Sequence, residues 1–192
     1  MDAIAKRPPI FSIQRANERP SFDHGWLKTS HSFSFAEYYD ANNVNWGALR
    51  VFNDDTVDAG AGFPPHPHRD MEIFTYVLSG ELEHQDTLGN RGIVGPGGIQ
   101  FMSAGTGVRH SEFNHRSDVP LHFVQMWVLP GRAGEAPSYG QKDFALEERR
   151  NRWLTIVSGR KDVDAPIRIT QDATFSVARL EDSIVVHEFE PQ

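Results

Sequence analysis

The feature that most constrains the fold of this chain is the spacing of its turn-forming residues. Sixteen glycines and twelve prolines are spread over 192 residues and divide the chain into short segments. Many of these segments are rich in β-branched and aromatic residues, and long amphipathic helical periodicity is absent. This pattern is typical of an all-β sandwich or barrel, in which short strands follow one another through tight turns.

The expected elements are nearly all strands. A hairpin turn is predicted at Gly80, and a second turn is predicted in the stretch TLGNRG at 87–92. One helix is predicted over 141–153, where acids come early and arginines late, and a loop without regular structure is predicted over 129–140. Strand-forming segments are expected at 47–54, 71–86, 98–104, 109–115, 121–130, 152–159, 166–172, 173–180 and 183–190.

Composition narrows the function classes. The chain has no cysteine, so any bound metal must have nitrogen and oxygen ligands, and the chain suits a reducing cytoplasm. The formal net charge of -7 argues against direct nucleic-acid binding. No apolar run approaches the roughly 20 residues that cross a bilayer, and the first residues lack the apolar core of a signal peptide, so no membrane association is expected.

Two histidines separated by one proline, His66 and His68, stand just ahead of an apolar segment. Residues two apart in a strand point to the same face, so both imidazoles are expected to project together while Pro67 faces away. Pro64, Pro65 and Pro67 cannot all occupy a central strand, because proline lacks the N–H donor of a ladder. The pair is therefore predicted at the start or edge of a strand.

A second segment repeats this geometry with a different pair. His110 and Glu112 are two residues apart, and Asn114 continues the same face. If this strand and the first one face each other inside a barrel, three imidazoles and one carboxylate form a mixed nitrogen and oxygen site. Such a site suits one divalent transition metal, with iron as the first choice and Mn, Co, Ni, Cu or Zn as alternatives, and it leaves positions open for small ligands.

Glu72 is predicted to lie near this site, because its alternation matches that of His68. It could ligate the metal, stand behind the ligands, or make a structural hydrogen bond, and we rank it below Glu112 as a ligand. Glu72 and Asn114 are therefore assigned to the surroundings of the ligands. The other histidines have local polar or surface explanations and are excluded from the metal set; they are His24, His31, His84, His115, His122 and His187.

The segments GAGFPPHPHRDME and GPGGIQFMSAGTGVRHSEFN resemble the two motifs of the cupin superfamily. More narrowly, HPHRDMEIFTYVLSGELEHQDTLGN, MSAGTGVRHSEFN and the upstream GWLKTSHSFSFAEYYD resemble the pirin family, from His24 onward. The resemblance implies a bicupin of two jelly-roll barrels, and it carries the ligand roles onto His66, His68, His110 and Glu112. Family members continue through several more strands after the segment that matches residues 172–192, so an incomplete C-terminal barrel is expected, with unpaired strands that favour a homo-oligomer.

The domain organisation expected from this resemblance has three parts: an N-terminal metal-binding cupin domain at 1–135, a linker with a short helix at 136–152, and a partial C-terminal cupin-like domain at 153–192. Bacterial members of the pirin family include quercetin 2,3-dioxygenases, which open a flavonol ring with O2 and release carbon monoxide. Animal pirin is described as an iron-dependent transcriptional co-regulator. The family alone therefore leaves the function open.

The first functional hypothesis is a metal-dependent flavonol dioxygenase, in which the metal binds the hydroxyl and carbonyl oxygens of the substrate and Glu112 takes the hydroxyl proton. The alternatives are a non-enzymatic, redox-sensing regulator that acts through protein contacts, and another cupin reaction such as sugar isomerisation. No substrate-binding residue is assigned. Several large apolar side chains could line a pocket, although each is more often ordinary core: Phe52, Phe74, Phe101, Met102, Phe123, Met126 and Trp127.

Overall fold

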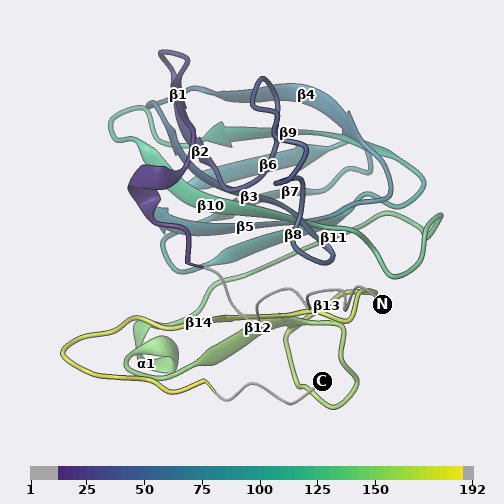
Figure 1. Ribbon diagram of the computed structural model, residues 1–192. Helices are drawn as coiled ribbons and strands as arrows, with labels where there is room; N and C mark the ends of the chain where they lie inside the picture. Colours follow the sequence, from purple (N-terminus) through teal and green to yellow (C-terminus); the bar gives the residue numbers. More distant parts are fainter. Residues whose placement is uncertain (1–12, 188–192) are drawn as a thin grey trace, which may run out of the picture.

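A computed structural model describes residues 13–187 and shows three layers of β-sheet stacked on one another (Figure 1). The large middle sheet contains, in spatial order, β1 (Ser21–Asp23), β2 (Leu27–His31), β3 (Leu49–Val57), β10 (Leu121–Val128), β5 (Glu72–Ser79), β8 (Ile99–Ser103) and β11 (Ser138–Lys142). The second sheet contains β4 (Gly62–His68), β9 (Val108–Asn114), β6 (Leu82–Asp86) and β7 (Arg91–Val94). The third contains β13 (Ile167–Arg168), β12 (Leu154–Ser158) and β14 (Thr174–Val177).

The first two sheets face each other and form an all-β jelly-roll barrel, as the sequence predicted. Strand alternation produces this packing: in β3 the buried positions are Val51, Asn53, Asp55 and Val57, and the residues between them are partly exposed. One apolar cluster between the sheets joins Leu82 and Val94 of the small sheet to Phe123 and other residues of the large sheet. The barrel interior therefore contains both apolar and polar side chains.

The third sheet covers the outer face of the large sheet (Figure 1). Phe74 and Phe101 of the large sheet are buried in one cluster with Ile156, Val157 and Ile167 of the third sheet. Because the third sheet covers β5 on the face turned away from the barrel, β5 is almost continuously buried from Glu72 to Val77. The described C-terminal residues thus form one three-stranded sheet, and the incomplete second barrel and its role in oligomerisation remain predictions.

Several predicted elements differ from the structure. The helix predicted over 141–153 is limited to α1 (Leu146–Arg149), and the stretch predicted as a loop ends in β11, which pairs with β8. Residues 183–187 of the last predicted strand form no strand, and residues 188–190 lie outside the described residues. The short 3-10 helix η1 (Ala16–Glu18) and the strands β1, β2 and β7 were not predicted, because they are short and lack a strong apolar pattern.

The two predicted turns are confirmed. Gly80 has a φ of 80° between β5 and β6, and Gly89 has a φ of 89° between β6 and β7. Positive φ values favour glycine, which explains why the reversals occur at these residues. No helix within residues 13–187 is long and apolar enough to span a membrane.

Candidate metal centre

His66 and His68 lie on β4, which is an edge strand of the small sheet, as predicted from its prolines. β4 pairs antiparallel with β9, and the register shifts between Phe63 and His66, where Pro64 and Pro65 have no N–H to contribute to a ladder. The side chain of Arg109 donates a hydrogen bond to the carbonyl oxygen of Pro65 at 2.8 Å. This bulge places His66 directly opposite His110.

His66, His68 and His110 therefore come together on neighbouring strands of one sheet, and not across the barrel as expected. Their ligand-type nitrogens all lie within 4.8 Å of one another, and the ring centroids are 4.5–4.9 Å apart. His110 is buried, whereas His66 and His68 are partly exposed. Three imidazoles at this spacing can hold a metal ion and leave one side of it open.

Hydrogen bonds leave one nitrogen of His66 and one of His110 free to ligate. Nδ1 of His66 lies 2.8 Å from the carbonyl oxygen of Pro64, which can only accept, so Nδ1 carries the proton and Nε2 keeps its lone pair. Nε2 of His110 is buried and has no hydrogen-bond partner within residues 13–187. A buried polar atom without a partner is costly, and a metal ion at this position would satisfy it. The residues present therefore fit a metal.

His84, which the sequence alone excludes from the metal set, connects this group to a buried carboxylate. Its Nδ1 lies 3.3 Å from Nδ1 of His110, and its Nε2 lies 3.2 Å from Oδ2 of Asp86. An ionised Asp86 accepts from Nε2–H of His84, so Nδ1 of His84 accepts from Nδ1–H of His110. This proton assignment, inferred from the hydrogen-bond network, leaves Nε2 of His110 without a proton, so its lone pair can bind a metal.

The electrostatics of the group favour neutral imidazoles. Burial lowers the pKa of His68 and that of His110 to about 4, and neighbouring histidines add to the effect. Both imidazoles are therefore neutral near pH 7, each with one N–H and one lone pair. Metal binding requires neutral imidazole, so these two ligands need no deprotonation when a metal arrives.

Glu112 lies on the same face of β9 but is held by other side chains. Its Oε1 accepts hydrogen bonds from Gln100 at 3.0 Å and Thr75 at 3.3 Å, and its Oε2 accepts one from Gln125 at 2.9 Å. Burial opposes ionisation of this carboxyl, but nearby histidines and Gln125 outweigh it and lower its pKa. Glu112 is therefore ionised, and it does not belong to the group of three histidines.

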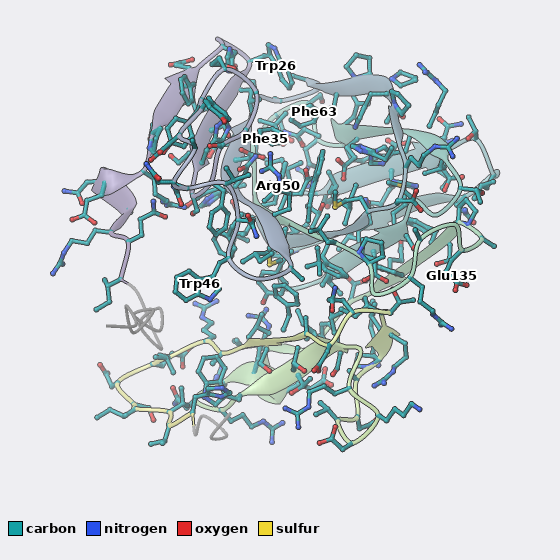
Figure 2. The ribbon with its side chains drawn as sticks, turned by 45° about the vertical axis from the view of Figure 1, so that its right-hand side comes forward. Trp26, Phe35, Trp46, Arg50, Phe63 and Glu135 are labelled. Atoms are coloured by element: carbon teal, nitrogen blue, oxygen red, sulfur yellow. The ribbon has the colours of Figure 1, made fainter. Side chains whose placement is uncertain are left out.

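A cavity of about 270 Å³ opens beside the histidines and is lined by His66, His68 and Glu112 together with aromatic side chains. The ring of Trp127 packs edge-on against the rings of His68 and Phe35, with centroid distances of 4.8 Å and 5.4 Å. Phe63, another lining residue, packs edge-on against Trp26 at 5.1 Å (Figure 2). Of the seven apolar residues named from the sequence, only Trp127 lines the cavity, and the others pack in or against the apolar clusters.

Comparison with known proteins places the chain in a family. The family model described as Pirin matches residues 12–128, which is more than half of the chain. The chain belongs to the pirin family. A quercetin 2,3-dioxygenase from Escherichia coli K12 is 45% identical over 177 residues, which are 92% of this chain and 75% of that protein. A pirin-like protein from Caulobacter vibrioides is 52% identical over 151 residues, 79% of this chain and 65% of that protein.

A solved structure supports the same relationship. The bacterial pirin YhhW from Escherichia coli in complex with nickel(II) is 46% identical to this chain, with a TM-score of 0.77. The match covers 84% of this chain and 68% of that one. This pirin-family chain therefore shares its fold with a protein that binds a divalent metal.

The structure corrects the position of Glu72. Its Oε1 accepts hydrogen bonds from the backbone N–H of Thr170 at 2.8 Å and from the Thr170 hydroxyl at 3.1 Å, so its carboxylate faces the third sheet. The alternation predicted from His68 fails because Asp70 has a φ of 46°, and the chain changes sheets at this turn. Of the three alternatives for Glu72, the structural hydrogen bond is the one observed.

The other predicted neighbour, Asn114, is also structural in this pirin. Its amide donates hydrogen bonds to the carbonyl oxygens of Val57, Asp58 and Val119, at 3.4, 3.2 and 2.8 Å, and its Oδ1 accepts from the N–H of Arg116. It fixes loops at one end of the barrel and makes no hydrogen bond to the histidines. Its assignment as a neighbour of the ligands was therefore wrong.

Five of the six excluded histidines divide into two groups, and the sixth, His187, is exposed, with its ring centroid 6.0 Å from that of Trp153. His24, His115 and His122 each contact a carboxylate at a partly exposed position, as expected. His31 and His84 are buried in the barrel, so a surface explanation is wrong for both, while the contact of His84 with Asp86 fits the local polar explanation. The burial of a single histidine within an alternating strand could not be predicted from the local sequence, because the strands that cover it are distant in sequence.

Proposed function

We propose that this pirin-family chain is a metal-dependent dioxygenase of the quercetin 2,3-dioxygenase type, which opens a flavonol ring with O2 and releases carbon monoxide. The observation that carries the proposal is the convergence of His66, His68 and His110 beside a cavity that Phe35, Phe63 and Trp127 help to line. A flat aromatic substrate suits such walls. The relative named quercetin 2,3-dioxygenase supports this substrate class.

In this proposal, the three histidines together bind one divalent transition metal ion, each through one imidazole nitrogen. Iron is our first choice of metal. The nickel-bound relative supports a divalent ion, and the ligand set also accepts Mn, Co, Cu or Zn. Glu112 as a fourth ligand remains a prediction from the sequence. Its carboxylate accepts hydrogen bonds from Gln100, Gln125 and Thr75, so about one lone-pair position is left for a metal ion or for a proton.

The catalytic role proposed for Glu112 is to accept the hydroxyl proton of the flavonol. A carboxylate offers about four lone-pair positions, so the three observed donors leave room for one more. Its lowered pKa makes Glu112 a weak base on its own. The metal would supply Lewis acidity, which lowers the pKa of the substrate hydroxyl and makes this proton transfer favourable.

Other residues would position the substrate and exclude water. Trp127 donates from Nε1 to Oε1 of Gln125 at 3.0 Å, and this bond orients the Gln125 amide toward Glu112. Phe35 and Trp127 form one wall against which a planar ring can stack. The proposed partners are thus a flavonol and O2 in the cytoplasm, without nucleic acid or membrane.

The test is aerobic incubation of metal-loaded protein with quercetin. Loss of the flavonol absorbance, O2 uptake and carbon monoxide release should occur together, and His66→Ala and Glu112→Gln should each lower turnover by about 100-fold or more. His122→Ala is the matched control, because His122 lies on β10 outside the cavity and contacts Asp54.

Unchanged turnover in His66→Ala would overturn the site assignment. If wild-type protein binds one metal ion but consumes neither quercetin nor O2 with any of the candidate metals, the dioxygenase proposal fails. A regulator that acts through protein contacts would then be the better explanation.

A further inference from the structure

A row of polar side chains crosses the interior of the barrel on the large sheet. Strand register places its members side by side on neighbouring strands, and all are buried. Polar groups in a barrel interior are costly unless each finds a hydrogen-bond partner. In spatial order from β2 to β8 the row consists of His31, Asn53, Gln125, Thr75 and Gln100.

Three of these five side chains are explained by the candidate centre. Gln125, Thr75 and Gln100 each donate a hydrogen bond to Glu112 at distances of 2.9–3.3 Å. These three side chains hold the carboxylate that the small sheet projects toward them. The donors of these three side chains are therefore used within the protein.

The other two members of the row, His31 and Asn53, have no such explanation. Nδ1 of His31 and Oδ1 of Asn53 are buried and make no hydrogen bond within residues 13–187. Oδ1 of Asp55, two residues farther along β3 on the same face, is also buried and has no hydrogen-bond partner among the described residues. All three residues line the 270 Å³ cavity together with His66, His68 and Glu112. Unpartnered polar atoms thus gather in the cavity beside the proposed reaction centre.

The chemistry of these atoms indicates what they bind. An amide oxygen and a carboxyl oxygen accept hydrogen bonds, and an imidazole nitrogen can donate or accept one. Hydroxyl groups complement such a set, and the aromatic rings of Phe35, Phe63 and Trp127 leave space between them for a planar ring. A purely apolar ligand would leave these polar atoms buried and unpaired, which selects against it.

We propose that His31, Asn53 and Asp55 form a hydroxyl-recognition subsite, which binds the hydroxylated ring of an aromatic substrate whose other end lies at His66, His68 and His110. This inference rests on the proposed function and specifies its substrate class. The subsite selects polyhydroxylated ring systems over otherwise similar ones without ring hydroxyls. Water alone in this part of the cavity would give no such selection.

The probes are quercetin and 3-hydroxyflavone. Both carry the 3-hydroxyl and 4-carbonyl groups that would face the three histidines, but only quercetin has hydroxyls on the outer rings. Dissociation constants are measured without O2, by the shift in flavonol absorbance with nickel-loaded protein, so that no turnover is needed. Wild type should bind quercetin about tenfold or more tightly than 3-hydroxyflavone, as one or more additional hydrogen bonds would give.

Asn53→Leu, which keeps the volume but removes the acceptor, should reduce this ratio by about tenfold. His31→Phe is a second variant that should reduce it in the same direction, and nickel content and circular dichroism confirm that each variant is loaded and folded. Asp54→Asn is the matched control, because Asp54 faces the opposite side of β3 and bonds to Arg19 and His122. Its ratio should equal that of wild type.

A wild-type ratio in both loaded, folded variants would overturn the subsite. Admitting air to the same samples and following flavonol oxidation distinguishes a failure of the proposed function from a failure of the subsite. Selective binding without oxidation of either flavonol, with nickel and with each of the other candidate metals, would retain the subsite and refute the dioxygenase. Oxidation of both flavonols with no selectivity in wild type would retain the dioxygenase and refute the subsite.

Discussion

His84 is the residue that decides which nitrogen of His110 can reach a metal. It is fully buried between His110 and Asp86, and its ring stacks on Tyr139 at 4.3 Å. Hydrogen bonds behind a ligand fix its tautomer and ring orientation and raise its basicity. His84 should therefore affect metal binding without touching the metal.

Replacing His84 by Phe keeps the aromatic stack on Tyr139 and removes the acceptor for His110. We expect the affinity for a divalent metal to fall about 10- to 100-fold, as for other residues that support a ligand. Competition with a chelator of known affinity measures this change. His115→Phe, a change at a partly exposed histidine that contacts Glu83, is the control. Equal affinities in His84→Phe and wild type would show that the network does not support the ligand.

Asp55 should make the stability depend on pH. Burial raises its pKa to about 7, with Asp54 and Glu112 adding to the effect and a hydrogen bond from Thr29 opposing it. Below pH 4 the carboxyl is protonated in both the folded and the unfolded chain. Between about pH 4 and 7 only the unfolded chain ionises, so wild type should lose about 4 kcal/mol of unfolding free energy over this range.

Asp55→Asn removes this titration. Its unfolding free energy relative to that of wild type should rise between pH 4 and 7, which urea denaturation at several pH values measures. The control, Asp54→Asn, should show no such rise between pH 4 and 7, because a lowered pKa confines the titration of Asp54 to pH values near and below 4. Burial opposes ionisation of Asp54, but hydrogen bonds from His122 and Arg19 lower its pKa, so its contribution to stability is lost as the pH falls. A pH-independent difference for Asp55→Asn would contradict the raised pKa.

At the scale of the element, the close approach of β4 to β9 positions the histidines. A Cβ added at Gly62 would overlap the carbonyl oxygen of Glu112 and lie 2.5 Å from Cα of Phe113, both on β9. Only glycine allows the two backbones to pair at this point. The strand could accommodate a side chain only by moving away from β9.

Gly62→Ala should therefore lower the unfolding free energy by about 1–3 kcal/mol, the usual cost of forced strand shifts, and should weaken metal binding because His66 moves relative to His110. Thermal unfolding and chelator competition measure the two effects. Gly140→Ala is the matched control, since Gly140 also lies in a strand and a Cβ there meets nothing within 4 Å. Metal binding by Gly62→Ala as tight as that of wild type would show that this strand spacing is not required.

The same strands show what could be predicted from the sequence. The two-residue period of a strand is local, so the shared face of His66 and His68, and that of His110 and Glu112, followed from spacing alone. The position of Glu72 did not, because the turn at Asp70 begins a strand in another sheet. The contact between His84 and His110 depends on the register of β6 against β9, which joins residues 26 apart and leaves no periodic signal in the sequence.

At the scale of the whole molecule, the third sheet is attached through a buried polar contact as well as through apolar packing. Glu72 is 1% exposed, and its carboxylate accepts hydrogen bonds from Thr170, while the Thr170 hydroxyl also accepts one from the N–H of Gly131. Burial raises the pKa of Glu72, and the bonds from Thr170 oppose this. This contact lies on the face of the large sheet opposite to the cavity.

Thr170→Val should lower the unfolding free energy by about 1–3 kcal/mol, because one buried acceptor and one N–H lose a partner. Metal affinity should remain that of wild type, since β5 separates this contact from the histidines. Urea denaturation and chelator competition on the same sample distinguish the two effects. Thr174→Val, which removes a hydroxyl contact with Ser158 within the third sheet, is a matched control for loss of a hydroxyl. A large loss of metal affinity in Thr170→Val would contradict this separation of the two faces.

The most direct measurement is the metal content of loaded protein after removal of free metal, determined by mass spectrometry of the element. Wild type and His122→Ala should each retain one divalent ion per chain. His66→Ala, His68→Ala and His110→Ala should each retain much less, because two imidazoles hold a metal more weakly than three. Full retention of one ion per chain when all three histidines are replaced together would contradict the convergence of these residues on a metal.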